Sequence, residues 1–223
     1  MKKKVEIIPA ILVNDFASLQ EEVDLVKLGT TRIQVDICDG QFTPQATWPY
    51  RKKDNTFEMI VREEEAMPAW ESIDYEFDLM VNHPEEVVDD WVSAGASRIV
   101  IHAESKGDVI AAIARLQGRV EIGLALNIDT PISMINDKLE INFIQLMGID
   151  HIGFQGQHFD EKVLNKIKEV KMAFPDLPIQ IDGGVSLETA TELIKAGAER
   201  LIVGSAIMDT DNPVVAIEAF RSL

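Results

Sequence analysis

The chain has 223 residues, of which 46% are hydrophobic and 26% are charged, proportions that are ordinary for a globular protein and argue against disorder. Its formal net charge of -17 repels phosphate backbones and anionic lipid surfaces, so we expect no nucleic-acid or membrane partner. The single cysteine, Cys38, cannot form an internal disulfide, which favours a cytoplasmic protein.

Short runs with strand composition alternate with helical patterns along the chain. The predicted strands are 5–12, 32–38, 72–81, 98–103, 120–126, 142–149, 177–182 and 200–207, and the predicted helices are 15–29, 84–95, 108–118, 160–174, 186–197 and 212–223. Repeated strand–helix units imply a parallel sheet, and about eight of them predict an α/β protein with one (β/α)₈ TIM-barrel domain over 1–223. A doubly wound open sheet is less favoured, because "PAILVNDF" after the first strand contains no glycine.

Capping chemistry marks the predicted helix boundaries. Good helix starts are Asp15, Pro84, Ser186 and Asn212 or Pro213, and good helix stops are Gly29, Gly95, Gly118 and Gly197.

One connection departs from the regular alternation, since 40–72 is longer than a usual strand-to-helix loop. We expect a helix at 55–65 and a long loop at 43–54 there, and an inert insertion is as good a reading as a cover for substrate.

Carboxylates occur in strands that are otherwise apolar. In "RIQVDIC", Gln34, Asp36 and Cys38 alternate with apolar residues that must face the helices, so the polar set is predicted to face the barrel interior. The same alternation turns Asp78 and Asp182 inward, and His102, Glu104 and Asn127 extend the polar ring at following strand ends. Barrel enzymes place their chemistry at this end of the strands.

Converging carboxylates repel one another, and a bound cation, a retained proton or a nearby base relieves that repulsion. All three remedies are typical of active sites.

Cys38 is better interpreted as a packing residue than as a nucleophile, because neighbouring carboxylates raise a thiol pKa. His151 and His158 are expected at the surface, and His83 just before a helix.

Glycine-containing motifs follow the later strands, as "GFQGQ" at 153–157, "DGG" at 182–184 and "GSA" at 204–206. Glycines at strand ends leave backbone N–H groups free to surround an anion, and barrels often bind a phosphate there. Each motif alone also fits a tight turn. Together they favour a phosphate site.

These motifs as a set resemble the ribulose-phosphate 3-epimerase family over nearly the whole chain. The similar stretches are "IIPAILVNDFASLQEEV", "IQVDICDGQFTP", "DLMVNHPE", "VIHAES", "GFQGQHF", "IQIDGGV" and "VGSAI". The resemblance implies a barrel of the ribulose-phosphate-binding type and an isomerase of carbohydrate metabolism, in the pentose phosphate pathway. Its reaction would be epimerisation at C3 of a pentulose 5-phosphate.

The resemblance also assigns roles to residues. Asp36 and Asp182 would be the catalytic acid and base, and a divalent metal cation would be held by Gln34, Asp36, Asp78 and Asp182. The family's two metal-binding histidines fall on Gln34 and Asp78. The oxygen ligands present here would suit Mg or Mn better than Zn or Fe. A site that binds no metal and holds one protonated aspartate is an equal alternative. Substrate and phosphate would contact Met147, Gly153, Phe154, Gln155, Gly156, Gly183, Gly184, Gly204 and Ser205.

Other departures bear on function. The family usually has serine where this chain has Ala10, which puts one substrate hydrogen bond in question. The expected partner is a small phosphorylated sugar, and the sequence leaves room for a homo-oligomer. Two alternatives stay open: a sugar-phosphate-binding barrel without catalysis, and a lyase of the same superfamily. Related lyases carry a lysine between paired aspartates, where this chain has Cys38.

Overall fold

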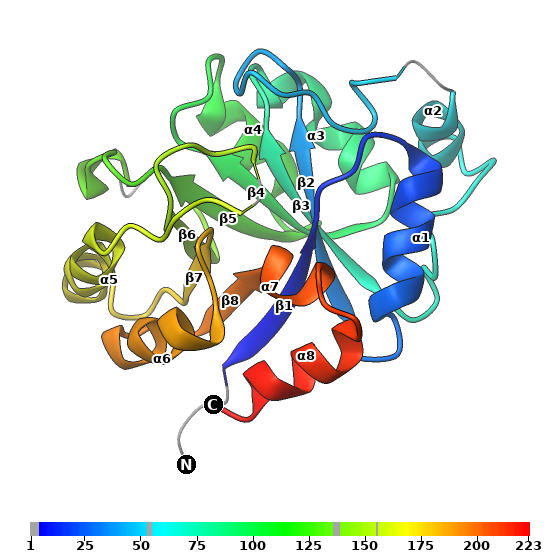
Figure 1. Cartoon of the computed structure of the whole chain (residues 1–223). Coiled ribbons are helices and arrows are strands. Elements are labelled where there is room, and N and C mark those ends of the chain that lie inside the picture. Colours follow the sequence, from blue (N-terminus) through cyan, green and yellow to red (C-terminus); the bar gives the residue numbers. More distant parts are fainter. Residues whose placement is uncertain (1–4, 53–54, 136–138, 155) are drawn as a thin grey trace.

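The structure is a computed structural model that describes residues 5–52, 55–135, 139–154 and 156–223. Eight parallel strands pair in chain order from β1 to β8, and β8 pairs with β1, so the sheet closes into a barrel with helices outside (Figure 1). The predicted (β/α)₈ TIM barrel is therefore confirmed. No helix of the described residues is long and apolar enough to cross a membrane.

The strands are β1 (Glu6–Ile11), β2 (Arg32–Cys38), β3 (Asp74–Met80), β4 (Ala96–His102), β5 (Glu121–Leu126), β6 (Phe143–Met147), β7 (Ile179–Asp182) and β8 (Arg200–Val203). The helices are α1 (Phe16–Val26), α2 (Thr56–Val61), α3 (Pro84–Ser93), α4 (Val109–Leu116), α5 (Lys162–Ala173), α6 (Leu187–Ala196), α7 (Ser205–Met208) and α8 (Pro213–Arg221), with a 3₁₀ turn η1 (Ile132–Met134).

Capping explains where several helices begin. The Asp15 carboxylate accepts from the Ser18 N–H at 3.0 Å, and the Asn212 amide oxygen accepts from the Val215 N–H at 3.2 Å. Ser186 and Thr189 form a reciprocal capping box at the start of α6. These predicted helix starts are confirmed.

Two elements end four residues before their predicted ends. Helix α2 ends at Val61 instead of continuing through residue 65, because Glu63 adopts a left-handed backbone with φ 60°. The strand predicted at 200–207 stops at Val203, where Gly204 turns the chain and caps the short helix α7. The strand prediction was wrong there because its apolar residues continue into a buried helix.

The apolar core lies between the strands and the helices. Ile33, Val35 and Ile37 of β2 are fully buried in it, as the alternation predicts. The opposite face of the strands fills the barrel interior, where Asp36 pairs in register with Asp78, and Met147 with Asp182. The barrel thus encloses polar side chains inside an apolar shell.

An ionic network closes the N-terminal end of the barrel. The Arg98 guanidinium donates to Glu121 at 2.6 Å and pairs with Glu76 at 3.3 Å, and Arg200 stacks over the Phe143 ring at 4.6 Å. Burial raises the pKa of Glu76 to about 7, although Arg98 and the Gln180 amide oppose that rise. These ion pairs fill the N-terminal end of the barrel, so any ligand must bind at the C-terminal ends of the strands.

The long connection after β2 is anchored against the barrel. Trp48 is buried and packs against the rings of Phe16, Phe57 and Trp91. The Thr47 hydroxyl donates to the Asp36 carbonyl at 2.9 Å and accepts from the Cys38 N–H at 2.8 Å. The loop therefore supports the end of the strand that carries Asp36.

Candidate active site

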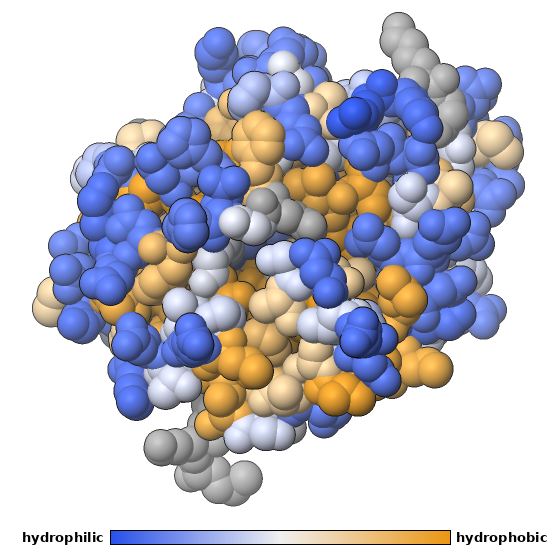
Figure 2. All heavy atoms as spheres, viewed as in Figure 1, coloured by the Kyte–Doolittle hydropathy of each residue, from blue (hydrophilic) through white to orange (hydrophobic). Residues whose placement is uncertain are grey.

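A cavity of about 380 Å³ opens at the C-terminal ends of β1, β2, β6, β7 and β8. Its floor contains Asp36 and Asp182, and its wall includes α7, which lies beside β1 and α8 (Figure 1). On the face seen in this view, hydrophilic side chains form most of the periphery and apolar side chains gather nearer the middle (Figure 2). A small ligand suits a cavity of this size.

Asp36 lies near the end of β2 and Asp182 at the end of β7, and the side-chain amide of Gln34 donates a hydrogen bond to each of them. The Gln34 Nε2 group donates to Asp36 Oδ1 at 3.0 Å and to Asp182 Oδ2 at 3.3 Å. Each aspartate is only 8% exposed. Burial, followed by repulsion from Asp182 and Asp78, raises the pKa of Asp36 well above its usual value. Burial and the charge of Asp78 raise the pKa of Asp182 to about 7.

Asp78 lies deeper and is fully buried. Its Oδ1 lies 3.1 Å from His102 Nε2, and its Oδ2 accepts from Gln145 Nε2 at 3.0 Å. Burial disfavours a charged imidazole, but the nearby carboxylates of Asp78 and Glu104 outweigh it and raise the pKa of His102 to about 10. His102 is thus a buried cation among the carboxylates, and the Phe42 ring lies 5.1 Å from its ring.

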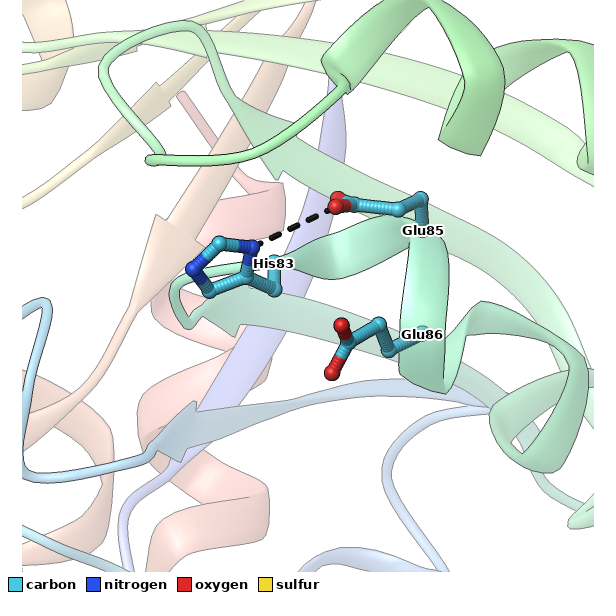
Figure 3. A group of neighbouring side chains, drawn as sticks. All are labelled: His83, Glu85 and Glu86. Carbon is cyan, nitrogen blue, oxygen red and sulfur yellow. Dashed lines mark hydrogen bonds and ion pairs between the residues drawn. The ribbon is translucent and has the colours of Figure 1, made fainter.

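Asp36, Asp78 and Asp182 each offer a carboxylate oxygen within 4.8 Å of the others, so they could share a cation. A second group with ligand spacing is His83, Glu85 and Glu86 at the start of α3, where His83 Nδ1 lies 3.3 Å from Glu85 Oε1 (Figure 3). His83 precedes α3, as predicted, and its side chain is exposed. That second group is outside the cavity lining.

The glycine motifs meet on one wall of the cavity. Gly183 and Gly184 have φ angles of 95° and 69°, and a Cβ at Gly184 would stand 2.7 Å from Phe159 Cα. Only glycine suits such positions. Among the described residues that line the cavity, none is lysine or arginine. An anion would therefore be held by backbone N–H groups, including those of the first turn of α7.

The residues predicted for substrate and phosphate all line this cavity where they are described: Met147, Gly153, Phe154, Gly156, Gly183, Gly184, Gly204 and Ser205. Gln155 lies outside the described residues. Of the predicted metal set, Gln34 and Asp78 are completely buried behind the aspartates at the floor. Glu104 lies beside the site and accepts from the Asn127 N–H at 2.8 Å.

Sequence reasoning missed two features. Gln145 contacts Asp78, and its inward direction could have been read from the alternation in "FIQLM". The direct contact of His102 with Asp78 needs the spatial pairing of β3 with β4, which no local pattern shows. His151 and His158 are exposed, as predicted.

The family model for the "Ribulose-phosphate 3 epimerase family" matches residues 6–208. The chain belongs to this family. It is 33% identical to the ribulose-phosphate 3-epimerase of Bacillus subtilis over 97% of this chain and 98% of that protein. It is 30% identical to the enzyme of the same name from Schizosaccharomyces pombe, over 98% of this chain and 93% of that protein.

Solved structures agree on the fold. KGPDC from Streptococcus mutans aligns with a TM-score of 0.72 at 16% identity over 98% of this chain and 96% of that one. 3-Hexulose-6-phosphate synthase from Salmonella typhimurium aligns with a TM-score of 0.71 at 12% identity over 97% of each chain.

Membership of the ribulose-phosphate 3-epimerase family supports an epimerase-like isomerase, and it favours neither the non-catalytic barrel nor the lyase. Burial, with the surrounding carboxylates, raises the thiol pKa of Cys38 to about 12, which disfavours a nucleophilic thiolate.

Proposed function

We propose that this chain epimerises a pentulose 5-phosphate at C3 by two-base proton transfer, with Asp36 and Asp182 as the acid/base pair. The observation that carries the proposal is the pair itself: two nearly buried carboxylates from β2 and β7 at the floor of one cavity, with raised pKa values. A glycine-lined wall stands beside them to hold the phosphate.

The path of the protons follows from the two carboxyl groups. The ionised aspartate takes the proton from C3, and the C–H electron pair moves toward the C2 carbonyl to give an enediolate. The protonated aspartate then delivers its proton to the opposite face of C3, which inverts the centre. One proton held between two repelling, buried carboxylates at neutral pH is the starting state that this reaction needs.

The phosphate would sit against the backbone N–H groups of Gly183, Gly184, Gly204 and Ser205. Since no basic side chain lines the described cavity, the amides and their fixed geometry must overcome the repulsion from an acidic chain. Phe154 also lines the cavity and is 40% exposed, so its ring is available to contact a bound sugar.

A divalent cation fits the carboxylate cluster. Asp36, Asp78 and Asp182 would hold it, and three carboxylates are ligands that suit Mg²⁺ or Mn²⁺. When bound, such a cation stabilises negative charge on the enediolate oxygen. We also propose a cytoplasmic location, which the single, buried cysteine supports.

The test is turnover of D-ribulose 5-phosphate by the purified protein in D₂O, followed by NMR. The proposal predicts D-xylulose 5-phosphate with deuterium at C3, loss of turnover after chelation, and recovery with Mn²⁺ or Mg²⁺. Binding of the sugar phosphate without turnover under any divalent cation would contradict the proposal and leave a binding protein.

A further inference from the structure

Three glutamine amides connect the carboxylates inside the barrel, and their directions are fixed by their partners. Gln180 Nε2 donates to Glu76 Oε1 at 2.6 Å and to Gln145 Oε1 at 2.8 Å, and it also lies 3.4 Å from Gln34 Oε1. Gln145 Nε2 donates to Asp78 Oδ2 at 3.0 Å, so the Gln145 oxygen faces Gln180, and the two N–H groups of Gln180 therefore point toward Gln145 and Glu76.

This arrangement fixes the direction of the Gln34 amide. Its oxygen faces the nitrogen of Gln180, and its nitrogen faces Asp36 and Asp182. Turning the amide over would place its nitrogen against the nitrogen of Gln180, and its oxygen against the ionised aspartate, which has no hydrogen to donate. Gln34 is fully buried, so water cannot repair those mismatches. An amide nitrogen that carries hydrogens is no ligand for a hard cation.

We propose, on the basis of the proposed epimerase function, that Gln34 is a positioning residue for the two catalytic aspartates and not a metal ligand. Its two N–H bonds engage one oxygen of each aspartate. The other oxygen of each carboxyl is then the one that carries the transferred proton. The amide thereby holds the acid and the base at a set separation on either side of the reacting carbon.

A histidine at this position could both bind the cation and align the two aspartates, whereas in this chain different residues would perform the two tasks. Cation binding would rest on Asp36, Asp78 and Asp182 alone, because Gln34 presents no oxygen to them. Alignment of the acid/base pair would rest on Gln34. Removing its amide should therefore slow proton transfer and leave cation affinity unchanged.

The test is Gln34→Met, which keeps the length of the side chain and removes the amide. We expect kcat to fall about ten- to a hundredfold, with KM within about threefold of wild type, because hydrogen bonds to charged groups are lost in the reacting state. Mn²⁺ affinity, measured by electron paramagnetic resonance on the same protein, should stay within about threefold.

Two control variants accompany it. Gln180→Met removes an equally buried amide that contacts no aspartate, and we expect a smaller fall in kcat at a similar loss of stability. Asp78→Asn removes a proposed ligand, and Mn²⁺ affinity should fall. A tenfold or greater loss of Mn²⁺ affinity in Gln34→Met, or a kcat equal to that of wild type, would overturn the inference.

The outcome for wild type separates this inference from the function on which it rests. Wild-type protein that fails to turn over D-ribulose 5-phosphate contradicts the proposed function. Wild-type turnover combined with lost Mn²⁺ affinity in Gln34→Met contradicts only the role given to Gln34. If wild type turns over and binds no Mn²⁺, Gln34 has no cation to ligate, and kcat of the variant decides alone.

Discussion

His102 supplies a buried positive charge to a cluster of carboxylates deep in the barrel. It reaches Asp78 from the neighbouring strand β4 and has Glu104 on its other side, with its ring nitrogens 3.1 Å and 3.7 Å from those carboxylates. In this chain the resemblance places Gln34 and Asp78 at positions where the family has histidines. An imidazole is nonetheless present beside Asp78, and it pairs with that carboxylate.

This pair predicts a specific dependence of stability on pH. The pKa of His102 is about 10 in the folded protein against 6.5 when exposed, so its contribution to the free energy of unfolding is fully present below pH 6.5. That contribution is lost as the pH rises through about 10.

Urea unfolding of His102→Gln across this range measures the effect. The gap in unfolding free energy between wild type and variant should be largest near pH 6 and should narrow as the pH rises from about 6.5 to about 10. The exposed His151→Gln variant serves as the control and should show no such narrowing. A gap that does not change with pH would show that His102 is neutral in the fold.

Ala10 lines the cavity and lies opposite Gln34 in the pairing of β1 with β2. Ala10→Ser would add a hydroxyl where the family usually has one. We expect KM for D-ribulose 5-phosphate to fall about two- to tenfold, the effect of one gained hydrogen bond. Steady-state kinetics measure it, and Ala10→Val, which adds volume and no hydroxyl, should raise KM. A KM for Ala10→Ser at or above that of wild type contradicts the prediction.

Among the elements, the long connection after β2 supports the strand that carries Asp36. The Thr47 hydroxyl joins the backbone of Asp36 to that of Cys38, and Trp48 fixes the connection against α1 and α3. Thr43 closely approaches Gly153 of the glycine wall. The connection therefore contacts both the end of the strand that carries Asp36 and the glycine wall.

Thr47→Val keeps the shape of this buried side chain and leaves the Cys38 N–H and the Asp36 carbonyl without their partner. We expect a loss of about 1–3 kcal/mol in unfolding free energy and a lower kcat. Thr47→Ser keeps the hydroxyl and should retain most of both. Denaturant unfolding followed by circular dichroism measures the first quantity, and an unchanged midpoint in Thr47→Val would refute the supporting role.

The sequence predicts those features that depend on residues close together in the chain, and it does not predict those that depend on contacts between distant strands. The alternation of polar and apolar residues in "RIQVDIC" was enough to predict that Asp36 points into the barrel. Capping residues were enough to predict the starts of α1, α6 and α8. The end of β8 was missed because Ile207 continues the apolar run from the strand into α7. The His102–Asp78 pair and the direction of the Gln34 amide depend on contacts between strands, so they required the structure.

At the scale of the whole molecule, an acidic chain concentrates three carboxylates in a closed barrel. Protons and a divalent cation should compete for them, because burial and mutual repulsion raise the pKa of Asp36 and bring that of Asp182 to about 7. Cation affinity should therefore rise between about pH 5 and about pH 8, and binding should release protons in acid.

Calorimetric titration with Mn²⁺ in two buffers of different ionisation enthalpy measures this release. We expect about one proton or more per cation near pH 6 and fewer near pH 9, where Asp182 is already ionised. Asp182→Asn should reduce the release in acid. Proton release of the same size at both values would contradict shared occupancy of the carboxylates.

The most direct test of the central claim is the rate of C3 epimerisation of D-ribulose 5-phosphate by Asp36→Asn and Asp182→Asn, followed by NMR in D₂O. Both variants keep the shape of the side chain, and circular dichroism checks that each is folded. We expect each variant to lose at least about a hundredfold in epimerisation rate, since each removes one of two obligatory proton carriers. Epimerisation within about tenfold of wild type in either folded variant would contradict the two-aspartate mechanism.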